Sequence, residues 1–362
     1  MDCRVKWVDS WRGLLIILVV LGHVIGGGLH FTQGATRAAS EFAFKLIYCF
    51  HMPAFFFLSG MLWNDNNTSI GRYAYRKLKR LIIPYWIFGV FSVVAYALVG
   101  GMITCFDGAS VDVYGTKVVP SVGRQLIQLV HGGNWPEGQG FLANSVLWFL
   151  PCMFTVQICY YFYNKMVPRI SSQILYSIVP LIIIGVFLSR KGFLYLPFGL
   201  SLAPYYLIFF MLGRLEIWKP IAIRELKSKI LFALSMMLLA IYACLCYFLP
   251  NQWKAEWSYQ WRLAFVMLAV IGIISSMLCA RLFCKWKYLQ ILGRSTIAIM
   301  LVHKFFILGV QIFQPVRKTY SLGGMCFVSA VFFVTVFSIV ASHCVGLIIR
   351  RYLPWAIGER AQ

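Results

Sequence analysis

The chain of 362 residues is 60% hydrophobic and 17% aromatic, and only 12% of its residues are charged. Soluble domains carry about 25% charged residues, so this composition excludes a soluble enzyme, a disordered chain and a small secreted module held by disulfides. A net charge of +22 would suit a nucleic-acid binder. In so apolar a chain, basic loops on the cytoplasmic face of a membrane explain it better, and no nucleic-acid partner is expected.

Apolar runs bounded by charged residues predict about ten transmembrane helices, because about 20 apolar residues cross a bilayer. These runs lie at residues 11–29, 42–62, 81–103, 146–163, 174–188, 200–217, 230–248, 262–278, 296–313 and 324–349. We therefore expect an all-α, polytopic membrane protein with one transmembrane domain over residues 1–362. The sequence ends at Gln362, directly after the last run, so no additional soluble domain is expected.

The distribution of basic residues predicts the orientation. An even number of spans places both termini on one side, and most of the 33 lysines and arginines fall on that side. The opposite side holds Arg37, Lys117, Arg124, Arg190, Lys191, Lys254, Arg262, Arg317 and Lys318, and Lys45, Arg214 and Lys304 fall inside spans. Because cytoplasmic loops are enriched in lysine and arginine, both termini are expected in the cytoplasm. Asp9 and the lack of a clear cleavage site argue against a signal peptide.

The first span carries two ionisable residues on one face. Arg12 and His23 are eleven positions apart, which is about three helical turns and about 16 Å. This places Arg12 at the cytoplasmic boundary and His23 near the middle of the membrane. Arg12 alone would be read as an interfacial anchor. An imidazole at the depth of His23 needs a partner, which either a functional site or helix packing would supply.

The second span carries a ladder of residues at steps of three and four, which share one helical face. The ladder consists of Glu41, Lys45, Tyr48, His51, Phe55 and Ser59. His51 lies at the predicted depth of His23 and precedes Pro53, where a helix can kink. The ninth span adds His303 and Lys304 at a similar depth. Three histidines could bind zinc, but no two are four apart on one helix and no carboxylate lies beside them, so no metal site is predicted.

Two connecting segments stand out. The inner loop at residues 72–86 carries five basic residues in its first nine positions. Such a cluster is often a topology signal or an anionic-lipid contact, and it would also suit the phosphates of a cytosolic donor. The long outer loop at 104–145, with His131, Trp135 and Glu137, is either an acceptor-binding lid or a solvated loop.

Several segments together resemble a known family. They are VDSWRGLLIILVVLGHV (8–24), FHMPAFFFLSGML (50–62), RKLKRLIIPYW (76–86), LWFL (147–150) and IAIMLVHKFF (297–306). In order and spacing they resemble the integral membrane acyltransferase-3 family, and within it the fucose 4-O-acetylase-like branch. The resemblance covers the first 150 residues and returns at the last of these segments.

The resemblance implies particular residues and an activity. An arginine and a histidine separated by ten residues mark the family's first helix, and Arg12 and His23 match them. A basic R-x-x-R-type element is matched by Lys77 and Arg80, with lysine in the first place, and the Phe-x-Ser-Gly element contains Ser59. The family pattern implies ten helices, an acyl-CoA donor from the cytosol, and transfer of an acyl group, usually acetyl, to a glycan hydroxyl. Many relatives carry an extracytoplasmic hydrolase-like domain, which this sequence lacks.

A sugar hydroxyl needs a base to attack a thioester, and histidine has a suitable pKa. His23 is therefore expected to act as base or as transient acyl acceptor, and Arg12 and His51 complete the predicted catalytic set. Arg76, Lys77, Lys79 and Arg80 are expected to bind the phosphates of acetyl-CoA, a substrate rather than a resident cofactor. The acceptor, a cell-surface or lipid-linked glycan, is expected at Glu41, Lys45, Ser59, Trp148 and His303.

The expected location is the cytoplasmic membrane of a bacterium, with membrane lipid around the helices. A transporter or flippase for a lipid-linked sugar is the main alternative, because buried charges would also suit a substrate path. Transporters often contain internal repeats, and none is evident in this sequence. A non-catalytic membrane scaffold is a third interpretation, although it would not need polar ladders in the middle of the membrane.

Overall fold

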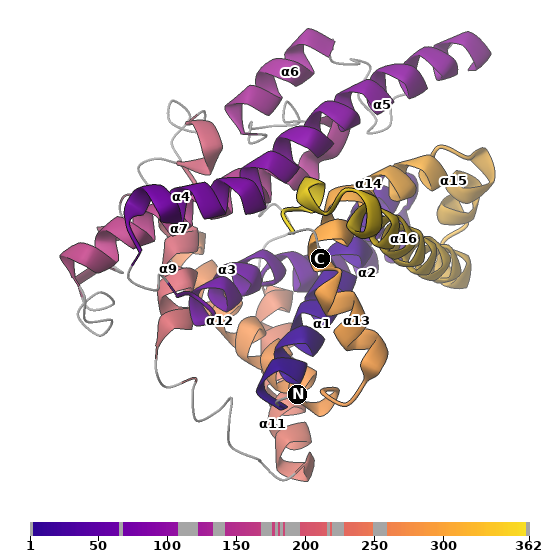
Figure 1. The fold of residues 1–362 in the computed structure, drawn as a ribbon. Coiled ribbons are helices and arrows are strands. Elements are labelled where there is room, and N and C mark those ends of the chain that lie inside the picture. Colours follow the sequence, from indigo (N-terminus) through magenta and orange to yellow (C-terminus); the bar gives the residue numbers. More distant parts are fainter. Residues whose placement is uncertain are drawn as a thin grey trace.

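The computed structural model describes residues 3–64, 68–107, 122–132, 142–167, 176–177, 180–181, 184, 196–215, 218, 228–248 and 259–359. These residues are almost entirely helical and contain no strand, so the all-α prediction is confirmed for this part of the chain. Figure 1 shows a helix bundle with α1 in its middle and the long α5 crossing one end.

The helices follow one another with short connections. In chain order they are α1 (Cys3–Gly28), η1 (Leu29–Phe31), α2 (Gly34–Tyr48), α3 (His51–Met61), α4 (Ile70–Lys77), η2 (Leu78–Ile82), α5 (Ile83–Asp107), α6 (Val122–His131), η3 (Leu142–Trp148), α7 (Phe149–Met166), η4 (Pro197–Gly199), α9 (Ala203–Arg214), α11 (Ser228–Phe248), α12 (Tyr259–Leu282), α13 (Lys287–Arg294), α14 (Thr296–Gln311), α15 (Gln314–Ser321), α16 (Gly324–Tyr352) and η5 (Pro354–Ile357).

Seven helical segments of the described chain are long and apolar enough to cross a membrane. They are Lys6–Phe31, Gly34–Met61, Ile70–Ala95, Ala143–Met166, Lys229–Phe248, Ala264–Leu282 and Gly324–Tyr352. The pair α13 and α14, bent by 83°, qualifies together as an eighth. By length and composition this is an integral membrane protein, whereas ten spans and cytoplasmic termini remain predictions.

Two of the expected spans account for the lower count. Most of the run at 174–188 lies outside the described residues. The run at 200–217 forms α9, which has 12 residues. At 1.5 Å per residue such a helix is about 18 Å long, shorter than the hydrocarbon core of about 30 Å.

The second span is broken at the position that its proline predicts. Pro53 has no N–H to donate to the carbonyl of Cys49, four residues earlier, and the helix is interrupted at Cys49 and Phe50. The polar ladder is therefore divided between two helices. Glu41, Lys45 and Tyr48 lie on α2, and His51, Phe55 and Ser59 lie on α3.

The basic segment at 72–86 is helical, so the prediction of a loop is wrong. Helix α4, the π-helical turn η2 and α5 follow one another without interruption from Ile70 to Asp107. The wider turn η2 ends just before Pro84, which cannot donate to the carbonyl of Arg80, and a π turn accommodates such a missing bond. The expected outer loop at 104–145 likewise contains the end of α5, helix α6 and part of η3.

Helix α1 is the centre of the packing. It contacts α2, α3, α12, α13, α14 and α16, and Figure 1 shows these helices around it. Trp11, Leu15, Ile16 and Val20 on α1 are completely buried. The residues at both ends of α1 are thereby held in fixed positions relative to the surrounding helices.

Two helix pairs approach closely through reciprocal glycines. A Cβ atom at Gly13 of α1 would overlap the carbonyl of Leu289 in α13, and one at Gly293 of α13 would overlap the carbonyl of Asp9 in α1. The pair α3 and α9 repeats the arrangement. There Gly60 lies against the carbonyl of Phe210 and Gly213 against that of Phe57. Small residues allow this backbone contact within a membrane bundle.

We expect Gly60→Ala and Gly213→Ala each to lower the thermal unfolding midpoint of the detergent-purified protein. An added methyl group must separate α3 from α9, and overpacking of this kind costs about 1–3 kcal/mol. The matched control is Gly309→Ala, because Gly309 in α14 has no neighbouring atom within 4 Å of an added Cβ. Equal midpoints for Gly60→Ala and Gly309→Ala would contradict the close contact.

Candidate active site

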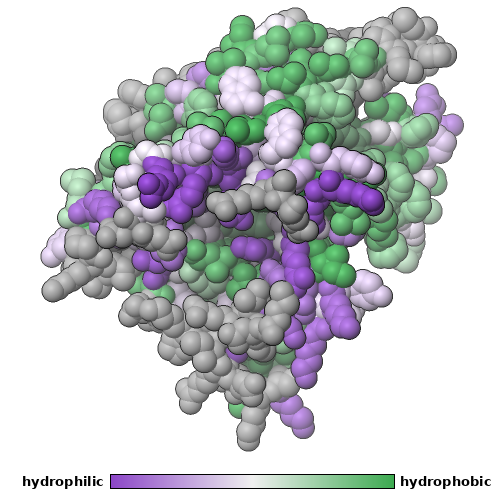
Figure 2. All heavy atoms as spheres, in the orientation of Figure 1, coloured by the Kyte–Doolittle hydropathy of each residue, from purple (hydrophilic) through white to green (hydrophobic). Residues whose placement is uncertain are grey.

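The basic residues that the sequence predicts for donor binding line one cavity. It has a volume of about 930 Å³ and lies among α3, the α4–α5 helix, α7, the start of α14 and the C-terminal segment. Its basic lining residues are Arg12, Arg76, Lys77, Lys79, Arg80 and Arg294. On the face shown in Figure 2, hydrophilic side chains gather around a hollow. Six cations around one cavity suit a ligand with several negative charges.

Asp9 forms ion pairs with two of these arginines. The residue is 5% exposed, and its carboxylate lies 3.1 Å from Nε of Arg294 and 3.7 Å from Nη1 of Arg12. Because Asp9 and Arg12 lie on α1 and Arg294 on α13, the ion pairs also join these two helices. The sequence places Asp9 three residues before Arg12, but it does not show the contact with Arg294.

The C-terminal segment forms one wall of the cavity through Trp355, Ile357, Gly358 and Glu359. Glu359 accepts two hydrogen bonds from Arg350, at 2.7 and 2.8 Å, and Arg350 also donates to the carbonyl of Arg294 at 3.1 Å. Gly358 has a φ of +71°, and a Cβ there would lie 2.7 Å from Cα of Arg80. The end of the described chain is therefore fitted against the basic segment.

Nearby groups orient the basic side chains of the α4–η2 segment. Nη2 of Arg76 donates to Oγ1 of Thr68 at 2.9 Å. Lys77 lies over the ring of Tyr73 at 5.0 Å, and Lys79 lies over that of Tyr75 at 4.5 Å. The first residues of α14 also line the cavity, and a helix N-terminus carries partial positive charge.

Behind the cations lies a pair of neutral polar residues. Nε2 of Gln157, on α7, donates to Oγ of Ser59, on α3, at 2.9 Å. Both residues line the cavity, and Oε1 of Gln157 is buried with no hydrogen-bond partner in the described structure. Ser59, expected among the acceptor-binding residues, thus lies in the same cavity as the basic residues expected to bind the donor.

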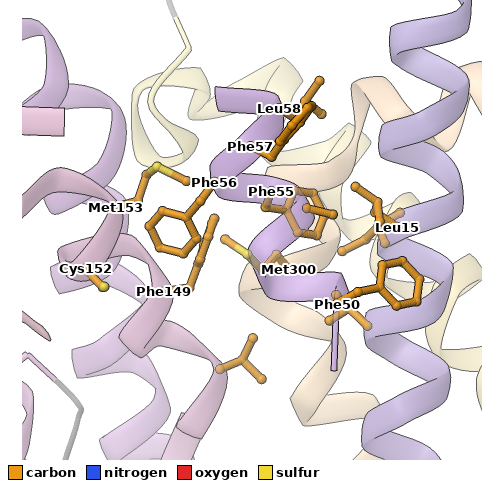
Figure 3. Close-up of a cluster of buried hydrophobic side chains, with 14 of the residues drawn as sticks. Leu15, Phe50, Phe55, Phe56, Phe57, Leu58, Phe149, Cys152, Met153 and Met300 are labelled. Atoms are coloured by element: carbon orange, nitrogen blue, oxygen red, sulfur yellow. The ribbon is translucent and has the colours of Figure 1, made fainter. Parts of the chain in front are cut away.

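The remaining part of the cavity wall is apolar. It includes Phe55, Phe149, Met153 and Met300, which lie close together in Figure 3. His51 lies four residues before Phe55 on α3, and His303 lies three residues after Met300 on α14. One helical turn therefore separates each histidine from the cavity wall. In the described structure, none of the three predicted histidines lines the cavity itself.

The three histidines nevertheless form one cluster with a tyrosine. The ring centroids of His23 and His303 are 5.5 Å apart, and those of Tyr48 and His51 are 4.8 Å apart. The hydroxyl of Tyr48 lies 3.0 Å from Nδ1 of His23. The cluster joins the three consecutive helices α1, α2 and α3 to α14, which lies far along the chain.

Local hydrogen bonds determine which ring nitrogen carries the proton in two of these histidines. Nδ1 of His51 lies 2.8 Å from the carbonyl of Ile47, and Nδ1 of His303 lies 2.9 Å from that of Ile299. A carbonyl only accepts hydrogen bonds, so both Nδ1 atoms carry the proton and both neutral rings keep a lone pair on Nε2. Nε2 of His303 is buried and has no hydrogen-bond partner in the described structure.

Three other predicted residues lie away from the cavity lining. Glu41 accepts a hydrogen bond from Arg37 at 3.0 Å. Nζ of Lys45 donates to the carbonyl of Cys246 at 3.2 Å, and the ring of Trp148 lies 5.6 Å from that of Tyr206. Their predicted contact with an acceptor stays a prediction.

The remaining predictions concern the outer loop and metals. His131 lies at the end of α6, whereas Trp135 and Glu137 lie outside the described residues, so the predicted lid stays untested. Across the described ranges, no three His, Cys, Asp or Glu side chains are grouped in a way that could hold a metal ion.

Sequence reasoning missed three residues of this region. Tyr48 belongs to the predicted ladder, but the ladder assigns it no role. The sequence pattern also gives no role to Gln157, an amide in the middle of an apolar span, or to Arg294. The signal for Gln157 was its polarity at a membrane-spanning position, whereas the roles of Tyr48 and Arg294 follow only from contacts between helices.

Comparison with known proteins identifies the family of the chain. The family model of acyltransferase-3, described as an acyltransferase domain, matches residues 5–344. No curated protein and no solved structure gave a significant match. The match spans nearly the whole chain, so this protein is an integral membrane acyltransferase of the acyltransferase-3 family.

Proposed function

We propose that the protein transfers an acetyl group from cytosolic acetyl-CoA to a hydroxyl of a cell-surface or lipid-linked glycan. The proposed location is the cytoplasmic membrane of a bacterium, and the fucose 4-O-acetylase-like branch stays the predicted subfamily. One observation carries the proposal. A cavity lined by six cations extends to apolar side chains one helical turn from His51 and His303, which cluster with His23.

The residues that line the cavity suit both the phosphates and the acetyl group of the donor. The phosphates of CoA would bind Arg76, Lys77, Lys79 and Arg80, and Arg12 and Arg294 line the same cavity. An acetyl group is small and apolar, which suits the wall formed by Phe55, Phe149, Met153 and Met300. A transporter of a lipid-linked sugar would not require six cations and an apolar wall in one cavity.

The proposed reaction uses His23 as base. Its Nε2 takes the proton of the acceptor hydroxyl while the hydroxyl oxygen attacks the thioester carbonyl. The carbon–sulfur bond then breaks, and the proton passes to the leaving thiolate of CoA. Attack by His23 itself, followed by transfer of the acetyl group to the hydroxyl, is the alternative route through the same ring.

We expect His23→Ala to reduce acetyl transfer by about 10²–10⁴-fold, the usual contribution of a general base. Transfer is measured by mass spectrometry of surface glycans from cells that express the protein or lack it, as a difference of one acetyl group. The matched control is His30→Ala, because His30 is exposed in η1. Equal acetylation by wild type and His23→Ala would remove His23 from the mechanism.

Charge reversal in the cavity should weaken the binding of the donor. We expect Lys77→Glu with Arg80→Glu to raise the Kd for acetyl-CoA at least about 10-fold, because charge-assisted hydrogen bonds to phosphate are lost. Titration calorimetry on the purified protein measures this Kd. The control is Lys285→Glu with Lys287→Glu, two exposed residues that do not line the cavity. An unchanged Kd in the first variant would count against the donor site, and so would wild-type protein that fails to bind acetyl-CoA.

A further inference from the structure

We propose that Ser59 and Gln157 form a binding site for the amide groups of the pantetheine arm of CoA. This inference rests on the proposed function and assigns a specific task to two residues within it. It starts from an unsatisfied atom. Oε1 of Gln157 is buried without a hydrogen-bond partner in the described structure, and the whole residue is only 6% exposed.

An unpaired buried amide oxygen is costly, typically by more than a hydrogen bond contributes when it forms. Gln157 cannot easily turn away, because its Nε2 donates to Oγ of Ser59 at 2.9 Å. Gln157 lines the cavity, although its Oε1 is covered in the described structure. A small movement of the neighbouring side chains would bring a ligand N–H to this oxygen, which has no other donor among the described residues.

Ser59 supplies the complementary group. Its Oγ accepts the hydrogen bond from Gln157, so its own proton remains available to donate. The pair thus offers one acceptor and one donor side by side, which matches the N–H and C=O of a secondary amide. The pantetheine arm of CoA contains two such amides between the pyrophosphate and the thiol.

The position of the pair agrees with this assignment. Gln157 and Ser59 line the same cavity as the cationic residues and the apolar Phe55 and Met300. Ser59 is four residues after Phe55 on α3, which is one helical turn. Most other polar side chains in the described lining are lysine and arginine, which donate but never accept. Gln157 thus provides an acceptor where those cations provide only donors.

The test compares two ligands on the full-length protein in detergent. CoA carries the pantetheine arm, whereas adenosine 3′,5′-bisphosphate carries adenosine and phosphates without it. We expect Gln157→Leu to raise the Kd for CoA about 10-fold, and the Kd for the bisphosphate less than about 2-fold. Ser59→Ala should show the same selectivity, and the double variant should lose less than the product of the single losses, because the two residues act as a unit.

The control is Thr155→Val, on the same helix as Gln157. Its hydroxyl donates to the carbonyl of Phe198 and it does not line the cavity, so both Kd values should stay unchanged. Gln157→Met, which keeps the length of the side chain, replaces Gln157→Leu if that variant unfolds on heating at a much lower temperature.

Two kinds of result would overturn the inference. Equal weakening of both ligands, or no weakening of CoA, would remove the amide site while leaving the donor cavity in place. Wild-type protein that binds neither CoA nor the bisphosphate would refute the proposed function, and the amide site with it.

Discussion

A buried carboxylate between two arginines determines the form of the cavity. Asp9 is 5% exposed, and leaving such a carboxylate without a partner would cost several kcal/mol. Arg12 and Arg294 therefore stay beside it, which fixes α13 against α1 and holds both guanidinium groups at the cavity wall. One negative charge neutralises only part of this pair of cations, so the cavity remains positive and suits a polyanionic ligand.

The cavity and the histidine cluster are neighbours rather than one continuous space. Phe55 and Met300 lie on the cavity wall, and His51 and His303 lie one turn farther along the same helices. For the proposed transfer, the thioester must pass these apolar side chains to reach His23. Methionine is unbranched and flexible, so Met300 is the side chain that can change its conformation most easily. His51 and His303 are buried, whereas His23 is half-buried.

The sequence predicts those features of the fold that depend on residues close together in the chain, such as helix length, helix breaks and the faces of helices. Because a bilayer has a fixed thickness, apolar runs of matching length predict helices. Pro53 predicts a kink in the second span, and the helix is interrupted just before it, at Cys49 and Phe50. The shared depth of His23, His51 and His303 followed from counting turns. The charged segment at 72–86 resembled a loop because its polarity outweighed the helix propensity of its residues. Partners from other helices, such as Arg294 for Asp9 and Tyr48 for His23, leave no local pattern.

Tyr48 bears most directly on the proposed chemistry. The rings of His51 and His303 hold their Nδ1 protons on carbonyls of their own helices, so their tautomers follow from local geometry. The partner of His23 is a hydroxyl, which can donate or accept. If Tyr48 donates, Nε2 of His23 carries the proton and is no base. If Tyr48 accepts, Nε2 holds a lone pair for the acceptor hydroxyl. The base role of His23 thus requires that the Tyr48 proton go to another acceptor, so a residue outside the family's arginine–histidine signature controls it.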